Sequence, residues 1–199
     1  MTPPNFPGYG RYCPYHAPQL RTARRLIQVS GTRGARVVVW TNPFLEPGAR
    51  SIVPVLRRLG YRVSLKVVPY ERYFGQISDS RNRIQIGSGV WSSDYPAAAD
   101  FLSHLLSCAA FIPHSPYNIN WAEFCDPRID AQMRRAAATQ STDPERANSL
   151  WAAVDRRMVD AAPWLPLAIQ QSVELVSKRV GNYQYNPQYG GLIDQLWVR

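Results

Sequence analysis

The spacing of apolar positions in the first part of the chain switches between that of a helix and that of a strand. Residues 19–30 carry an apolar stripe at helical spacing and are followed by Gly31, a residue suited to end a helix. Residues 37–40 are a continuous apolar run, and residues 63–67 alternate apolar and polar positions. A helical stripe over 52–59 separates these two runs. The order predicts a β-α-β unit, in which a helix covers two parallel strands.

The pattern then repeats in a shorter form. A helix is expected over 71–78 and a strand over 83–86, and the strand stops at the glycines of 87–89. An apolar pattern at helical spacing occupies the end of the stretch 87–106. The stretch 87–106 is therefore expected to run from a strand through a loop into a helix, and binding side chains are common on such loops.

The second half predicts two further helices and two further strands. Asp126 is a suitable N-cap for one helix. The Thr142-Asp-Pro-Glu sequence has the capping-box pattern for another helix, which Pro163 ends. Residues 164–169 and 173–176 are apolar runs of strand length.

Composition adds the class of the fold and one atypical segment. The 199 residues are 45% hydrophobic, enough for one large domain or two small ones with a buried core. Alternating strands and helices place the chain in the α/β class, with a sheet flanked by helices. Residues 1–18 hold five prolines and two glycines without periodicity, so we expect a Pro-rich arm or linker there.

The net charge of +9 is unevenly distributed. Residues 1–85 contain fourteen Lys or Arg against three acids, whereas residues 86–199 contain nine against eleven. No Lys/Arg block exceeds two residues and no nucleic-acid-binding motif is present. The excess is expected to form a solvated basic face, with no nucleic acid as a partner.

The three cysteines limit the metal sites and the cellular compartment that are expected. They lack the ligand spacing of a zinc site, so no metal site is expected. Cys108 and Cys125 flank a Pro- and Asn-rich loop that a disulfide between them can close, which implies an oxidising compartment. No apolar run has the length of a membrane span, and no signal peptide follows Met1.

Signatures of catalysis are missing from the sequence. It contains no Gly-rich phosphate loop, no Gly-x-Ser-x-Gly elbow and no His-Glu-x-x-His pattern. His16, His104 and His114 are dispersed, and none has a nearby acid-base partner in sequence. Asp126 and Asp130 are four apart and can share a helix face, where capping is the favoured interpretation. We expect a protein that is not an enzyme and needs no cofactor.

Trp91 and Asp94 are the candidate binding residues of the loop within the stretch 87–106. An indole and a carboxylate three positions apart offer a flat apolar wall beside a negative charge, which suits a cationic ligand. The alternative is a core tryptophan and a helix-capping aspartate, and the spacing alone favours that alternative. A second loop containing Tyr117, Asn118 and Asn120 can hydrogen-bond a polar ligand if it borders a cleft.

Several short motifs, taken in order, resemble one known family. They are Pro7-Gly-Tyr, Cys13-Pro-Tyr, the run 34–40, Leu59-Gly-Tyr, Trp91-Ser-Ser-Asp-Tyr-Pro, the stretch 120–130 and Ala162-Pro-Trp-Leu-Pro-Leu. This succession resembles the C-terminal part of the extracellular solute-binding proteins of the peptide and nickel transporter class, solute-binding protein family 5. Trp-x-x-Asp-Tyr-Pro is the strongest of these motifs, and the resemblance covers nearly the whole chain.

The resemblance implies a partial two-lobe fold. We expect a periplasmic-binding-protein type II-like lobe, with a mixed sheet flanked by helices. Residues 19–160 would form the second lobe, and residues 161–199 would return to complete the first. Family members have an additional N-terminal region, with an export signal, that this chain lacks. They deliver a ligand to an ABC permease outside the cytoplasm and perform no covalent chemistry.

The resemblance also implies the roles of individual residues. Asp94 would pair with the α-ammonium of a peptide, Trp91 would form an apolar wall, and the Ser92 backbone would hydrogen-bond an extended ligand. Tyr95 and Asn120, which lie in matching motifs, are the other expected ligand contacts. The family often continues Asp-Tyr-Pro-Asp-Pro, whereas this chain has three alanines before Asp100.

A different role also fits part of the resemblance. The ends 181–184 and 194–199 are also similar to ligand-sensing domains joined to bacterial transcriptional regulators. Such a protein would be cytoplasmic, and its ligand would control binding to DNA by another domain. This alternative stays open at the level of the sequence.

Overall fold

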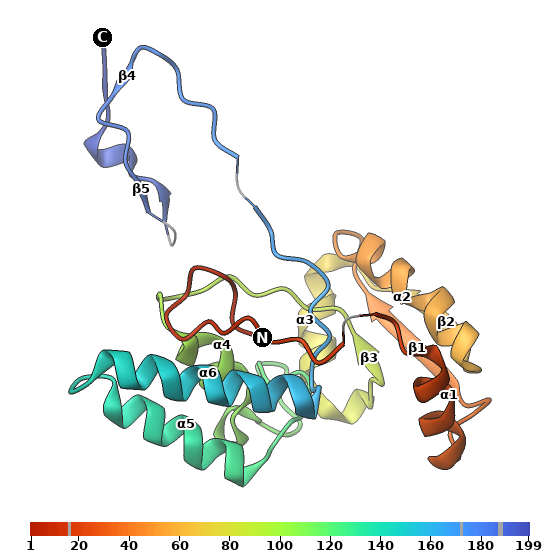
Figure 1. Ribbon diagram of the computed structural model, residues 1–199. Helices are drawn as coiled ribbons and strands as arrows, with labels where there is room; N and C mark the ends of the chain where they lie inside the picture. Colours follow the sequence, from red (N-terminus) through yellow and green to blue (C-terminus); the bar gives the residue numbers. More distant parts are fainter. Residues whose placement is uncertain (16, 172, 187–188) are drawn as a thin grey trace.

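A three-stranded parallel sheet forms the first half of the protein (Figure 1). The computed structural model describes residues 1–15, 17–171, 173–186 and 189–199. Strands β1 (Arg36–Thr41), β2 (Arg62–Val67) and β3 (Ile86–Gly87) lie in the order β2-β1-β3, and both pairings are parallel. Helix α2 (Glu46–Leu59) connects β1 to β2. The predicted β-α-β unit is confirmed.

Helix α2 covers one face of this sheet. Its buried Ala49 and Val53 contact Val39 of β1, and further apolar side chains of the three strands pack around them. The helix begins six residues before the predicted stripe and includes Pro54, and Gly60 ends it with φ of 106°. Helix α1 (Leu20–Val29) packs against α2. The helices predicted over 19–30 and 52–59 therefore exist, the second with an additional N-terminal part.

Helix α3 (Tyr70–Ser78) follows β2 and carries the aromatic side chains of a second small core. Its Tyr73 and Ile77 are buried together with Val68. The helix predicted over 71–78 is confirmed, whereas the predicted strand 83–86 is shorter and later, at Ile86–Gly87. Three short 3₁₀ segments complete the local structure, at Ser80–Asn82, Cys108–Ala110 and Ile193–Gln195.

Three helices pack into a separate core in the second half. They are α4 (Ala98–Leu106), α5 (Pro127–Thr139) and α6 (Pro144–Ala161). Leu102, Trp151 and Met158 are fully or almost fully buried in the core that they share. The predicted cap of α5 is confirmed, because the Asp126 carboxylate accepts hydrogen bonds from the first turn.

The predicted start of α6 needs one correction. Asp143, and not Thr142, is the N-cap, and its carboxylate accepts a hydrogen bond from the Arg146 amide at 3.0 Å. Pro144 then occupies the first helical position, where its missing N–H and fixed φ are favourable. The N-cap thus lies one residue later than the pattern predicts, and because Arg146 occupies the third helical position, the predicted capping box is absent.

The Pro-rich N-terminal segment lies along the helical core. The Thr2 amide and hydroxyl donate to the buried Asp155 carboxylate of α6 at 2.8 and 3.2 Å. Phe6 packs edge-on against Phe101 of α4, with ring centroids 5.2 Å apart. Residues 1–15 therefore bind to the helices through both polar and aromatic contacts.

The two strands predicted over 164–169 and 173–176 are wrong for the described residues. This segment leaves the helical core as an extended chain (Figure 1) and has no strand partner among the described residues. Leu165, Val173 and Leu175 are 70%, 86% and 98% exposed. A strand needs a neighbouring strand for its backbone hydrogen bonds, so an apolar run alone does not form one.

Two small antiparallel ribbons end the chain. β4 (Val180–Gly181) pairs with β7 (Trp197–Val198), and β5 (Tyr185–Asn186) pairs with β6 (Gly190–Gly191). Trp197 and Tyr185 remain about half exposed. No helix in the described part of the chain has the length and hydropathy needed to cross a membrane.

Candidate functional site

The loop with the predicted binding residues begins at the carboxyl end of the parallel sheet. β3 ends at Gly87, which is in register with Trp40 near the end of β1. Residues 88–97 then connect β3 to α4. In α/β folds, ligands bind outside the carboxyl ends of parallel strands. The topology therefore places this loop where a ligand site is expected.

Tyr73 fixes the start of this loop. Its buried hydroxyl accepts a hydrogen bond from the Ser88 amide at 2.8 Å. It donates to the Ser88 carbonyl at 2.7 Å, and the Trp40 carbonyl is also within range at 3.0 Å. Burial raises the pKa of Tyr73 to about 12, so its hydroxyl keeps its proton at neutral pH. One side chain thus joins α3, β1 and the loop.

Asp100 organises the middle of the loop. This residue of the first turn of α4 is fully buried. Its Oδ2 accepts hydrogen bonds from the Trp91 indole Nε1 at 3.1 Å and from the Asp94 amide at 3.0 Å. Its Oδ1 is buried and has no hydrogen-bond partner. Asp100 was not among the predicted site residues, although an acid inside the first turn of an apolar helix was a signal.

Trp91 is held in place by the helical core and by Asp100. The half-buried indole packs against the helical core, and its ring lies 5.4 Å from that of His104. The indole N–H donates to Asp100. The structure therefore gives Trp91 the packing role of the core alternative and fixes the orientation of its ring.

Asp94 does not cap α4. The N-cap position belongs to Ala97, and the Asp94 side chain is exposed. Within the described residues, its carboxylate has no ion pair or hydrogen bond. The backbone of Asp94 is fixed by Asp100, so an unpaired charge is presented from an anchored loop.

Ser92 and Tyr95 lie on the outer side of the same loop. Ser92 is exposed and Tyr95 is 44% exposed. Burial, and then the charges of Asp100 and Asp94, raise the pKa of Tyr95. Both carboxylates therefore act on this phenol, which places the negative potential of the loop beside Tyr95. The loop brings together Trp91, Ser92, Asp94 and Tyr95.

Asn120 lies outside this group and has a structural role. It is fully buried, and its Nδ2 donates to the carbonyls of Ser107 and Phe124 at 3.1 and 2.8 Å. Its Oδ1 accepts from the Phe124 amide at 3.1 Å. Both amide hydrogens are used inside the protein. We therefore leave Asn120 out of the candidate site.

The hydrogen bonds of Asn120 belong to a loop closed by a disulfide. Cys108 and Cys125 are bonded, with their Cα atoms 4.4 Å apart, and Cys13 is an exposed free thiol. The Asp130 carboxylate accepts from the Cys108 amide at 3.2 Å, so Asp130 anchors this loop to α5. Asp130 therefore stabilises the disulfide loop, whereas Asp126 caps helix α5.

Metal and histidine chemistry add nothing to this site. Across the residues that the structure describes, no group of three His, Cys, Asp or Glu side chains is placed to hold a metal ion. The His104 ring contacts Trp91 at an interplanar angle of 50°, and the His114 Nδ1 atom lies 3.3 Å from the Ser80 hydroxyl. His16 lies outside the described residues.

Comparison with known proteins finds similar peptide-binding proteins. No family model matches the chain. It is 26% identical over 192 residues to "Probable di/tripeptide-binding protein 5" of Pseudomonas aeruginosa (strain UCBPP-PA14), and 23% identical to "Di/tripeptide-binding protein 4" of the same strain. The chain is similar to one part of these peptide-binding proteins. The matches cover 93% of the chain but only 35% and 34% of the relatives, so the chain spans about a third of their length.

Solved structures of peptide-binding proteins share the fold. "Clavulanic acid biosynthesis oligopeptide binding protein 2" superposes with a TM-score of 0.88 at 23% identity, covering 98% of this chain and 37% of that one. The periplasmic binding protein DppA from Helicobacter pylori, in complex with peptide STSA, gives 0.79 at 21% identity and 38% coverage of its chain. The predicted type II-like α/β fold, partial relative to the complete proteins, is confirmed. The described three-stranded sheet is parallel, however, and not mixed as predicted.

Proposed function

We propose that the chain forms one ligand-binding lobe of a solute-binding protein that presents a peptide, or another small cationic solute, to an ABC permease. The observation that carries the proposal is the unpaired carboxylate of Asp94, exposed on a loop that Asp100 anchors at the carboxyl edge of the sheet. The relatives named as di/tripeptide-binding proteins support a peptide as the solute. The role is binding without covalent chemistry.

The electrostatics explain why one lobe binds weakly. An exposed ion pair contributes about 0 to 1 kcal/mol, because water screens the charges. When a second lobe excludes water, the same carboxylate and an α-ammonium interact in a lower dielectric and form a stronger charge-assisted bond. Asp94 supplies the charge, Trp91 the apolar wall, and the Ser92 backbone and Tyr95 flank the ligand.

The proposal extends to the complete protein. Its other partners are an N-terminal lobe that closes the cleft and the permease. We place the complete protein outside the cytoplasm, where a Cys108–Cys125 disulfide persists and where the related DppA, described as periplasmic, functions. The division into an arm at 1–18, a lobe at 19–160 and a returning segment at 161–199 is part of the proposal. The similar proteins give no support to a regulator's sensing domain.

A titration with a blocked ligand tests the role of Asp94. Alanyl-alanine is added to the ¹⁵N-labelled chain while the indole N–H signal of Trp91 is followed by NMR. We expect a concentration-dependent shift with the free dipeptide and none with N-acetyl-alanyl-alanine, which lacks the ammonium. Asp94→Asn should abolish the shift, whereas Asp194→Asn, a matched change at an exposed aspartate of the C-terminal segment, should keep it. Equal responses to both dipeptides would refute the proposal.

A further inference from the structure

The sheet has one face that no helix covers at its amino-terminal end. Side chains alternate along a strand, so the positions of β1 and β2 that face α2 are Val37, Val39, Val63 and Leu65. The opposite face carries the even-numbered positions. Trp40, at its far end, packs against the core formed with α3. The near end is open to solvent.

Two positively charged side chains are neighbours on this open face. Arg36 and Arg62 are direct cross-strand partners in the first pair of the β1–β2 register, and Val38 and Ser64 are the next pair on the same face. In the pair after that on this face, the Lys66 ammonium lies over the Trp40 ring, 3.4 Å from its centroid. Two like charges directly opposite each other destabilise a strand pair. The sheet tolerates this repulsion here without an internal counter-ion.

The acidic residues of the first half either pair with other arginines or lie away from this open face. Residues 1–85 contain three of them. Glu46 pairs with Arg50, and Asp79 pairs with Arg81. Glu71 lies in the first turn of α3, beyond the carboxyl end of β2. Within the described part of the chain, neither Arg36 nor Arg62 has an ion pair.

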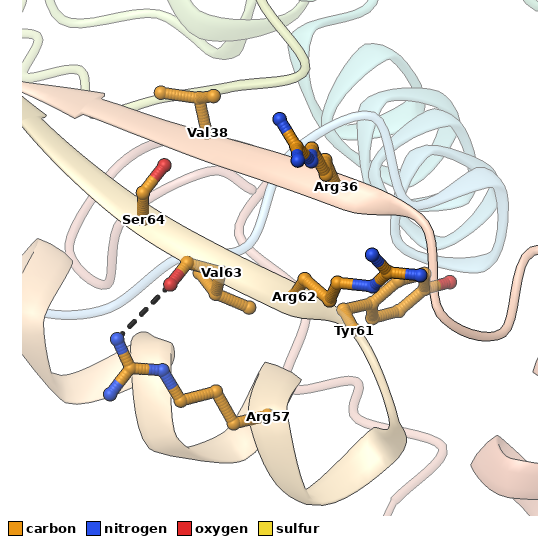
Figure 2. Close-up of a pocket in the computed structure, with 7 residues that line it drawn as sticks. All are labelled: Arg36, Val38, Arg57, Tyr61, Arg62, Val63 and Ser64. Carbon is orange, nitrogen blue, oxygen red and sulfur yellow. Dashed lines mark hydrogen bonds between the residues drawn. The ribbon is translucent and has the colours of Figure 1, made fainter.

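These arginines border a hollow of about 570 Å³ (Figure 2). Its lining consists of Arg36, Val38, Arg57, Tyr61, Arg62, Val63 and Ser64. Figure 2 shows Arg57 reaching from α2, and its guanidinium donates to the Val63 carbonyl at 3.0 Å. The Tyr61 hydroxyl shares a hydrogen bond of 3.0 Å with Thr32. Arg57 and Val63 lie on the side of β2 that faces α2, whereas Arg36, Arg62 and Ser64 lie on the open face, so the hollow extends around this edge strand.

We propose that the open face beside this hollow binds a small oxyanion of the phosphate class, held by the guanidinium groups of Arg36 and Arg62, which are neighbours across β1 and β2. Guanidinium groups bind phosphate oxygens in pairs of parallel hydrogen bonds, and the Ser64 hydroxyl adds a further donor. An apolar cover is excluded by composition, because a helix packed on a parallel sheet requires an apolar face. An anion removes the repulsion in this first pair. The site lies at the amino ends of the strands, away from the Asp94 loop, and is independent of the proposed solute function.

Phosphate titration of the complete 199-residue chain tests the site. Binding of inorganic phosphate is measured by calorimetry at fixed pH, with sodium chloride keeping the ionic strength constant. We expect saturable binding that weakens at least tenfold in the Arg36→Gln/Arg62→Gln double variant. The matched control, Arg134→Gln/Arg135→Gln, removes two exposed arginines of α5 and should bind as the native chain does.

Thermal unfolding without phosphate shows whether the double variant is folded. Its midpoint should equal or exceed that of the native chain, because the variant loses a repulsive pair. Absent or non-saturable phosphate binding would overturn the site, as would equal weakening in the two double variants.

Sedimentation with phosphatidylglycerol vesicles distinguishes the two sources of the phosphate group. Vesicle binding that needs Arg36 and Arg62, and that free phosphate competes away, assigns the group to a lipid surface. Phosphate binding without vesicle binding assigns it to a soluble anion. Both outcomes support the anion site. Vesicle binding that is unchanged in the Arg36→Gln/Arg62→Gln variant contradicts it.

Discussion

Replacing Asp100 by alanine is the sharpest test of how the loop is held. The change leaves two donors, the Trp91 indole N–H and the Asp94 amide, without their acceptor. Each unpaired buried donor costs about 1 to 3 kcal/mol. The change also removes a fully buried carboxylate with one unpartnered oxygen, whose desolvation opposes folding. The difference predicts a loss of about 2 kcal/mol in the free energy of unfolding.

The assay combines stability with local structure. Urea unfolding gives the free energy, and the indole N–H signal of Trp91 reports whether the loop keeps its geometry. Asp100→Asn is the matched control, because its amide oxygen still accepts both hydrogen bonds and should cost less than the alanine change. The reasoning fails if alanine changes stability by less than about 0.5 kcal/mol, a shift typical of ordinary surface substitutions. It also fails if asparagine is as harmful as alanine.

Three further predictions concern the disulfide loop and Tyr73. Reduction of the Cys108–Cys125 disulfide, which joins residues 17 positions apart, should lower the free energy of unfolding by about 3 kcal/mol. Urea unfolding with and without reductant measures this difference, and Cys13→Ser should leave it unchanged. Asn120→Ala, which removes three hydrogen bonds, should cost about 2 to 4 kcal/mol in the same assay, and a loss below 1 kcal/mol would contradict its structural role. The pKa of Tyr73 is raised from 10.0 to about 12, so its contribution is complete below pH 10 and lost as pH rises towards 12. The urea midpoint should fall less over this range in Tyr73→Phe than in the native chain.

Periodicity was sufficient to predict the elements whose partners are close in sequence. The β-α-β unit follows from one apolar run, one helical stripe and one alternating run, because the connecting helix buries its stripe on its own two strands. The same reasoning located the loop after β3. It failed at 164–169 and 173–176, where the apolar side chains have no partner among the described residues. An apolar pattern indicates that a segment packs against another element, but it does not identify that element.

The sequence locates the candidate loop, but it does not show which residues hold that loop in place. Trp91 and Asp94 stood out because an aromatic and an acid are conspicuous in a loop. Asp100 and Tyr73 act through buried hydrogen bonds to groups 9 and 15 positions away, and sequence spacing does not show such bonds. Asn120 illustrates the reverse case. An asparagine in an Asn-rich loop suggested a ligand contact, yet its amide hydrogens bind the carbonyls of its own loop.

The fold shows where the unevenly distributed charges of the chain lie. The carboxyl edge of the sheet leads into the loop that presents Asp94, while the amino edge presents Arg36 and Arg62 on an open face. A parallel sheet puts all strand starts at one edge and all strand ends at the other, so these opposite charges are separated by the length of β1. A cation at Asp94 and an anion at the arginines therefore do not compete for one site. The basic excess of residues 1–85 does not argue against a cationic solute at the other edge.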